Sequence, residues 1–147
     1  MINKLKVLFL CTGNSCRSQM AEAWAKELKS GLFEAYSAGI ETHGLNKNAV
    51  KVMAEVGVDM SGHISENVRD YLDKDIDLVV TVCDHASETC PIFPGSIKLI
   101  HHSFEDPPKL ARNKNTDDEK LECYRKVRDE IKDFIMQMKV DCRGLGV

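Results

Sequence analysis

Residues 5–10 read Leu-Lys-Val-Leu-Phe-Leu, and residues 11–18 follow directly with Cys-Thr-Gly-Asn-Ser-Cys-Arg-Ser. The first stretch is an apolar run of strand length, which predicts a buried strand. After it, apolar residues recur at helical spacing from Met20 to Leu28, and Gly31 marks the expected end of that helix. A strand that enters a helix through a short polar loop is typical of the first unit of an α/β fold.

Strands and helices continue to alternate along the chain. Helices are expected after Asn46, after Ser65 and after Thr116, since each is a suitable N-cap before an apolar periodic segment. This alternation predicts one α/β domain with a parallel sheet and helices on both faces. We assign residues 1–140 to the domain and residues 141–147 to a C-terminal tail without a clear pattern. The further strands are predicted at residues 33–37, 77–82 and 97–100.

Composition and charge limit the function classes. The chain has 147 residues, 43% of them hydrophobic, which is enough for one core without disulfides or a metal. A net charge of -3 argues against broad nucleic-acid binding, which needs a basic face. The apolar runs are too short for a signal core or a membrane span. We therefore expect a cytoplasmic monomer, in which six cysteines are catalytic, redox-active or metal-binding.

The loop between the first strand and helix has the features of an anion site. Gly13 and Asn14 allow a tight loop whose N–H groups point at one centre, and the helix N-terminus adds further donors. Arg17 offers a fork of donors that matches a tetrahedral oxyanion. The thiolate of Cys11 should be favoured there, with Ser18 placed to donate a hydrogen bond to it. The predicted oxyanion-binding residues are Thr12, Gly13, Asn14, Ser15, Cys16, Arg17 and Ser18.

A less specific interpretation of this loop is a buried strand-end Cys11 beside a surface Arg17. The spacing Cys-x5-Arg is weak evidence by itself, but its place between a buried strand and an amphipathic helix favours the anion site. We expect the Cys16 side chain to be structural, and we assign no function to Cys123 and Cys142.

Three residues further along the chain are candidates for chemistry. Asp106 precedes two prolines, and a carboxyl held in this way could act as a general acid, although an Asp-Pro pair is more often only a turn. Cys83 ends the third strand, which places it on the same sheet edge as Cys11. Cys90 follows across a short helical segment that Asp84 could cap. As alternatives, Cys83 and Cys90 are small buried hydrophobes, or they bind zinc with His85 and either His101 or His102.

Residues 11–18, followed by Gln-Met-Ala-Glu at residues 19–22, resemble the opening of thioredoxin-coupled arsenate reductases. These enzymes share their fold with low-molecular-weight tyrosine phosphatases. The resemblance implies a central four-stranded parallel sheet flanked by helices. This sequence departs from the family at His102 and Ser103, where the family often has Trp and Gly. The likeness continues through residues 36–41, 43–46, 77–83, 90–91 and 127–131.

The resemblance also implies a mechanism. Cys11 would attack arsenate, with Arg17 binding the oxyanion and Asp106 acting as the acid. Cys83 would displace arsenite to form a Cys11–Cys83 disulfide, and Cys90 would convert it to Cys83–Cys90. Thioredoxin would be the external reductant, and no tightly bound cofactor is expected. In some relatives a potassium ion lies near the loop. The matching positions here are Asn14, Glu22, Ser37 and Glu66, and the family residue at the last position is commonly Asp.

Two other functions are consistent with the loop. A low-molecular-weight tyrosine phosphatase would use Cys11, Arg17 and Asp106 through a phosphocysteine. Such phosphatases do not require Cys83 and Cys90, and they usually place an aromatic residue where this chain has a second proline. The other alternative is a non-catalytic anion-binding or redox-sensing module, which would show no turnover.

Overall fold

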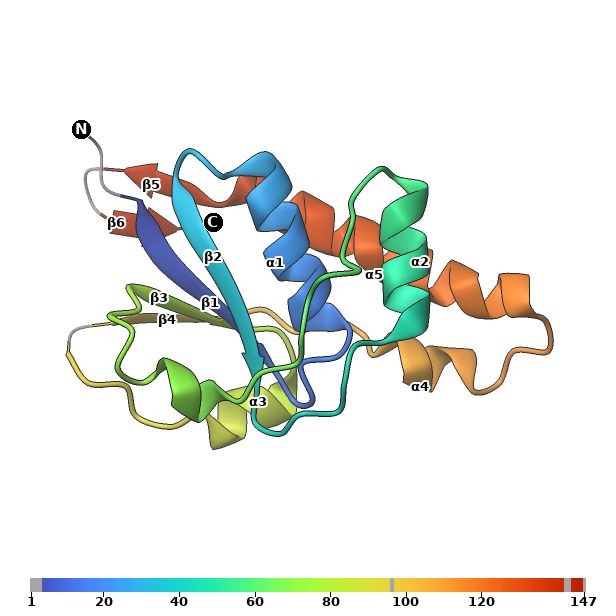
Figure 1. Cartoon of the computed structure of the whole chain (residues 1–147), viewed down its shortest axis with the longest axis horizontal. Coiled ribbons are helices and arrows are strands. Elements are labelled where there is room, and N and C mark those ends of the chain that lie inside the picture. The colour runs from blue at the N-terminus through green and yellow to red at the C-terminus, as the bar shows by residue number, and fades with distance from the viewer. Residues whose placement is uncertain (1–3, 96, 142–143, 147) are drawn as a thin grey trace.

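A four-stranded parallel sheet forms the centre of the protein (Figure 1). The computed structural model describes residues 4–95, 97–141 and 144–146. The strand order is β2-β1-β3-β4, and every neighbouring pair runs parallel, as predicted. The strands are β1 (Leu5–Cys11), β2 (Phe33–Gly39), β3 (Leu78–Thr81) and β4 (Lys98–His101).

The apolar run of β1 reflects its central position. Val7, Leu8, Phe9 and Leu10 are all 0% exposed, because β1 pairs with β2 on one side and with β3 on the other while both faces of the sheet are covered. A strand that is buried on both faces has no polar alternation, and its continuous hydrophobic run is typical of a parallel sheet.

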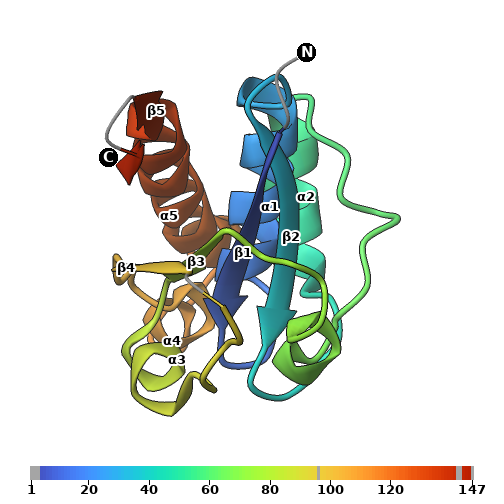
Figure 2. The ribbon, with the colours of Figure 1, turned by 90° about the vertical axis from the view of Figure 1, so that its left-hand side faces the viewer.

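Helices cover the sheet and close its carboxyl end. The long α5 packs against α1, α2 and α4, while α1 packs on β1 and β2. Both views place α3 and α4 at the end toward which the arrowheads of β1 and β2 point (Figures 1 and 2). The helices are α1 (Arg17–Leu28), α2 (Lys47–Glu55), α3 (Asp84–Thr89), α4 (Pro107–Ala111) and α5 (Asp117–Gln137), with one 3-10 turn, η1 (Val68–Tyr71).

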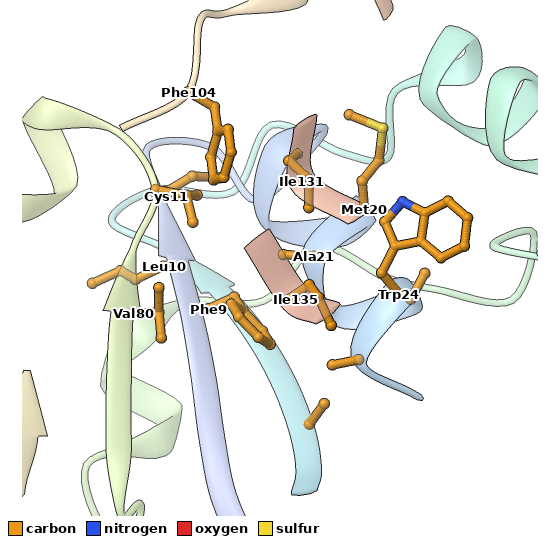
Figure 3. Packing of buried hydrophobic residues seen from close by; sticks show 14 of the residues in the cluster. Phe9, Leu10, Cys11, Met20, Ala21, Trp24, Val80, Phe104, Ile131 and Ile135 are labelled. Atoms are coloured by element: carbon orange, nitrogen blue, oxygen red, sulfur yellow. The ribbon is translucent and has the colours of Figure 1, made fainter. Parts of the chain in front are cut away.

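The core lies between the sheet, α1 and α5. Figure 3 shows Phe9 of β1, Met20 of α1 and Ile135 of α5 among the buried side chains that fill this layer. Trp24 of α1 is buried beside them, and its Nε1 donates to the backbone oxygen of Arg128 at 3.1 Å. The indole therefore contributes apolar area and also satisfies its polar atom. No helix among the described residues is long and apolar enough to cross a membrane.

Two of the predicted helix starts are confirmed. Asn46 caps α2, since its side-chain oxygen accepts from the backbone N–H groups of Asn48 and Ala49 at 2.9 and 3.0 Å. Thr116 caps α5, and its hydroxyl oxygen accepts from Glu119 N at 3.1 Å. Both side chains satisfy donors that the first helical turn leaves without partners.

Two other predicted caps are wrong. Asn67, not Ser65, caps η1, and the Ser65 hydroxyl instead donates to the backbone oxygen of Gly13 at 2.9 Å. Cys83, not Asp84, is the N-cap of α3, and Asp84 is the first helical residue. In both cases the side chain contacts a residue from another segment instead of capping the helix: Ser65 contacts Gly13, and Asp84 contacts His101.

Two further features differ from the expected loops. Pro107 and Pro108 begin α4, since proline is well suited to the first turn of a helix, where its missing N–H is not needed. In the tail, β5 (Lys139–Asp141) pairs antiparallel with β6 (Gly144–Gly146). The division between residues 140 and 141 falls inside β5, and the domain assignment stays a prediction.

Candidate active site

The loop after β1 turns tightly at the carboxyl end of the sheet and leads into α1. Asn14 has a positive φ of 49°, which its short polar side chain tolerates. Gly39 of β2 lies directly behind the loop. A Cβ at Gly39 would lie 2.7 Å from Asn14 N and 2.8 Å from Thr12 O, so only glycine fits there. The loop conformation thus depends on the neighbouring strand as well as on its own residues.

A buried hydrogen-bond chain ends at the Cys11 sulfur. Asn14 Nδ2 donates to Ser18 Oγ at 2.8 Å, and Ser18 Oγ lies 2.8 Å from Cys11 Sγ. Because the serine oxygen accepts from Asn14, its own O–H can donate to the sulfur. A hydroxyl that donates to sulfur stabilises the thiolate form, which is the nucleophilic form of a cysteine. The predicted role of Ser18 is supported by this geometry.

Gln19 holds the loop from beneath and was not predicted as a functional residue. It is fully buried, and its Nε2 lies 3.1 Å from Asn14 O, 3.0 Å from Asn14 Oδ1 and 2.9 Å from Ile64 O. The Asn14 side chain also accepts from Glu66 N at 2.8 Å. A polar residue within the apolar stripe of α1 was the available sequence signal for this role.

A pocket of about 290 Å³ opens above the Cys11 thiol. Its lining brings together residues from the loop, from the segment after β2 and from the start of α4. The lining residues are Cys11, Thr12, Gly13, Ser15, Cys16, Arg17, His43, Asp106 and Pro108. The predicted nucleophile, arginine and acid therefore share one small cavity, which is of a size suited to a small oxyanion.

Arg17 and Asp106 face each other across this pocket. Arg17 Nη1 donates to the backbone oxygen of Phe104 at 3.0 Å, and its Nη2 lies 3.8 Å from Asp106 Oδ1. Asp106 occupies the N-cap position of α4 but makes no capping hydrogen bond, so its carboxylate remains available to the pocket. Figure 3 shows Phe104 close to Cys11, which links the acid-bearing segment to the end of β1.

His43 is a pocket residue that the sequence did not single out. Its ring lies against Gly13, where a Cβ would be only 2.2 Å from His43 Nδ1. Its Nε2 lies 2.7 Å from Glu41 Oε2. Glycine at position 13 is therefore needed for the histidine to approach the loop, as well as for the turn.

Cys83 and Cys90 lie at the two ends of α3. Cys83 is 3% exposed, and its Sγ lies 3.3 Å from Thr12 Oγ1 of the anion loop. Cys90 is half-buried, and burial raises the pKa of its thiol. Cys83 thus lies at the same sheet edge as Cys11, where it was expected, while Cys90 is at the far end of α3.

The remaining cysteines differ in their surroundings. Cys16 is buried in the core, and its pKa is raised, first by burial and then by the nearby Cys11 and Asp106. This agrees with the predicted structural role of its side chain. Cys11, Cys16, Cys83, Cys90 and Cys123 are all free thiols, and Cys142 lies outside the described residues.

The predicted cation positions cluster beneath the loop, but Lys26 already supplies a positive charge there. Lys26 Nζ pairs with Glu22 Oε2, and the Ser37 hydroxyl donates to Glu22 Oε1 at 2.5 Å. Asn14 Oδ1 already accepts hydrogen bonds from Gln19 Nε2 and from Glu66 N. These oxygens thus have protein partners, and the potassium site stays a prediction. Among the described residues, no group of three or more His, Cys, Asp or Glu side chains could hold a metal, and the alternative zinc site is not formed.

This combination of a strand-end cysteine, an anion loop, an arginine and an acid defines a cysteine-dependent enzyme of the phosphatase type. The chain belongs to the low molecular weight phosphotyrosine protein phosphatase family, whose sequence profile matches residues 6–143. The family assignment and the four-stranded fold expected from the resemblance are thereby confirmed.

Within this family, curated relatives carry the name arsenate reductase. The protein from Bacillus subtilis is 50% identical over 131 residues, covering 89% of this chain and 91% of its own. The one from Halalkalibacterium halodurans is 49% identical over 130 residues, covering 88% and 91%.

Solved structures of similar proteins include both activities of the fold. An arsenate reductase in the oxidized state matches with a TM-score of 0.71 and 32% identity, covering 88% of this chain and 92% of its own. A low-molecular-weight protein tyrosine phosphatase from T. tengcongensis matches with a TM-score of 0.71 and 31% identity, covering 90% and 96%.

Proposed function

We propose that this protein reduces arsenate to arsenite through Cys11, Cys83 and Cys90, with thioredoxin as the external reductant. The names of the relatives at about half identity support the reaction. The observation that best supports the relay is the 3.3 Å contact between Thr12 Oγ1 and Cys83 Sγ, because it means that a second thiol lies beside the anion loop. A phosphatase has no use for that thiol in its reaction.

In the first step the Cys11 thiolate attacks arsenic and an oxygen of arsenate leaves. The loop N–H groups and the Arg17 guanidinium bind the oxyanion, whose shape and charge match phosphate. Asp106 gives its proton to the leaving oxygen, so that water is released rather than hydroxide. The product of this step is a covalent Cys11–arsenic adduct.

In the second step the Cys83 thiolate attacks the Cys11 sulfur. The sulfur–arsenic bond breaks and its electron pair stays on arsenic, which leaves as arsenite. The Thr12 hydroxyl can donate a hydrogen bond to the attacking thiolate. Two thiols have then given two electrons to arsenic and formed one Cys11–Cys83 disulfide.

In the third step Cys90 attacks the Cys83 sulfur and releases the Cys11 thiolate. The disulfide moves to Cys83–Cys90, and a thioredoxin dithiol reduces it by two thiol–disulfide exchanges. No tightly bound cofactor is needed, because the electrons pass from the thiols to arsenic and are replaced by thiol–disulfide exchange. Since all three thiols must start reduced, a cytoplasmic location suits the cycle.

Arsenite production with thioredoxin, thioredoxin reductase and NADPH tests the proposal. The wild-type protein should turn over continuously, while Cys11→Ser should lose both this activity and phosphate-ester hydrolysis. Cys83→Ser and Cys90→Ser should lose thioredoxin-linked turnover and keep phosphate-ester hydrolysis. Steady turnover by Cys90→Ser would rule out the relay. Phosphate-ester hydrolysis without any arsenite would favour the phosphatase alternative, and the absence of both would favour a binding module.

A further inference from the structure

A chain of side-chain contacts joins the start of α3 to the ends of two strands. His101 Nε2, at the end of β4, lies 3.0 Å from Asp84 Oδ1, in the first residue of α3. The other ring nitrogen, Nδ1, lies 2.7 Å from Thr81 Oγ1, at the end of β3. Thr81 is 0% exposed, so the imidazole is held between a buried hydroxyl and the carboxylate of the helix.

These contacts are satisfied whether or not the imidazole is charged. In the neutral ring, the Thr81 hydroxyl donates to Nδ1 and Nε2–H donates to Asp84. In the imidazolium, both N–H groups donate, and the Thr81 hydroxyl can turn to the backbone oxygen of Ile100 at 3.5 Å. Both ring nitrogens therefore have a partner in either form of the ring.

The two ends of α3 are held very differently. A helix of six residues has little stability of its own, so its tertiary contacts decide whether it forms. The first turn has the Asp84–His101 contact and the fully buried Ala86. Beyond the last turn, Cys90 is only half-buried, and Ile92 is 95% exposed. The contact that joins α3 to β4 thus lies at its first turn, whereas the Thr89 hydroxyl in the last turn donates only within the helix, to His85 O at 2.6 Å.

Formation of the Cys83–Cys90 bond requires this helix to open. Residues seven positions apart on a helix are separated by about 10.5 Å along its axis, at ~1.5 Å per residue. A disulfide needs Cα atoms only about 4.4–6.8 Å apart. The backbone that carries Asp84 must therefore change its path when the bond forms.

We propose that His101 is a positioning residue of the thiol relay, which stabilises the helical, reduced form of α3 through Asp84. The inference rests on the proposed function and adds a residue to it. Because the contact belongs to the reduced form, it makes the Cys83–Cys90 disulfide harder to form and easier for the external dithiol to reduce. The contact thus favours reduction of the Cys83–Cys90 disulfide, which returns the enzyme to its starting form.

The equilibrium constant of the Cys83–Cys90 couple tests this role. The full chain carrying Cys11→Ser is equilibrated with reduced and oxidised glutathione. The protein dithiol gives two electrons and two protons to glutathione disulfide, which becomes two glutathione thiols. Acid quenching and mass spectrometry then measure the fraction of protein with the intramolecular bond. In this background we compare His101→Asn, Asp84→Asn and the double variant, with Thr81→Val as a second way to release the ring.

Each single variant should shift the constant about threefold toward the disulfide, as expected when a contact of this type is lost. The double variant should shift it no further than the larger single effect, since both remove the same contact. His102→Phe is the matched control and should leave the constant unchanged, because the His102 ring packs at a tilt against Phe104 and Phe134.

Equal constants in the parent and the variants, or fully additive effects of Asp84→Asn and His101→Asn, would overturn the role of His101. This result differs from failure of the relay itself. If the Cys83–Cys90 bond does not form even in the parent, the proposed function fails and the inference fails with it.

Discussion

Thr12 Oγ1 lies 3.3 Å from Cys83 Sγ, so one side-chain pair connects the anion loop to the start of α3. Thr12 follows Cys11 at the end of β1, whereas Cys83 follows the end of a different strand, β3. The pairing of β1 with β3, which aligns Leu10 with Thr81, brings the two residues together. The register of the sheet is therefore what places a second thiol within reach of the first.

Replacing Thr12 with valine should slow the release of arsenite. Valine keeps the shape of the side chain but cannot donate to the Cys83 thiolate, and a hydrogen bond to a charged group contributes about 1.5–3 kcal/mol. The loss corresponds to roughly tenfold or more in rate. Single-turnover arsenite release measures it, and Thr12→Ser should restore most of the rate. A valine variant as fast as wild type would show that the contact has no kinetic role.

Asp106→Asn should slow chemistry far more than it weakens oxyanion binding. A general acid contributes ~100- to 10,000-fold in rate. The carboxylate lies 3.8 Å from Arg17 and makes no capping bond that would explain it as structural. Hydrolysis of p-nitrophenyl phosphate and the binding constant of phosphate separate the two effects. Glu105→Gln is the control, because Glu105 pairs with Lys126 outside the pocket. An unchanged rate would show that Asp106 is not a general acid and only precedes α4.

Oxidation should open α3. In the oxidised protein, amide hydrogen exchange at residues 84–90 should become faster, because a Cys83–Cys90 bond cannot span an intact helix. Exchange in β1 and β3 should change little, since these strands are buried inside the sheet. Mass spectrometry must confirm the bond in the same sample. Equal protection of residues 84–90 in both forms would contradict the switch.

Cys90 should react slowly near neutral pH in the reduced protein. Burial raises the pKa of its thiol, so the reactive thiolate is scarce at neutral pH and keeps increasing beyond pH 9. The rate of alkylation by iodoacetamide, followed on the peptide that contains Cys90, should rise about tenfold per pH unit over this range. In urea the same cysteine should titrate at its ordinary value. A rate that levels off below that value in the folded protein would contradict the assignment.

Replacing Lys26 with methionine should make the stability of the site beneath the loop depend on an added cation. Glu22 is only 13% exposed and would lose the ammonium partner of its Oε2, with His63 Nε2 left at 3.9 Å, which should lower the free energy of unfolding by ~1 kcal/mol. Potassium chloride, compared with choline chloride at equal ionic strength, should restore part of the loss. The control is Lys51→Met, an exposed lysine of α2 for which the described residues show no ion pair. If wild type is already stabilised by potassium, a cation binds beside Lys26.

Local sequence patterns were sufficient to predict several of the strands, turns and helix caps. The buried run of β1, the turn at Gly13 and Asn14, and a helix after this loop follow from residues close in sequence. The caps at Asn46 and Thr116 are local as well. The shared edge of Cys11 and Cys83 follows from the general behaviour of parallel sheets, whose strands end at one edge, whereas the strand order came from the structure. The candidate nucleophile and the candidate anion loop could therefore be proposed without coordinates.

Contacts between distant segments could not be obtained in this way. Ser65 contacts Gly13, Asp84 contacts His101 and Ser37 contacts Glu22, and each choice depends on which side chains the fold brings within hydrogen-bond distance. A capping preference is worth about 1 kcal/mol and is readily outweighed by a buried or charged partner from another element. The sequence therefore specified the reacting groups through local chemistry, whereas their orientation depends on long-range packing that no local pattern encodes.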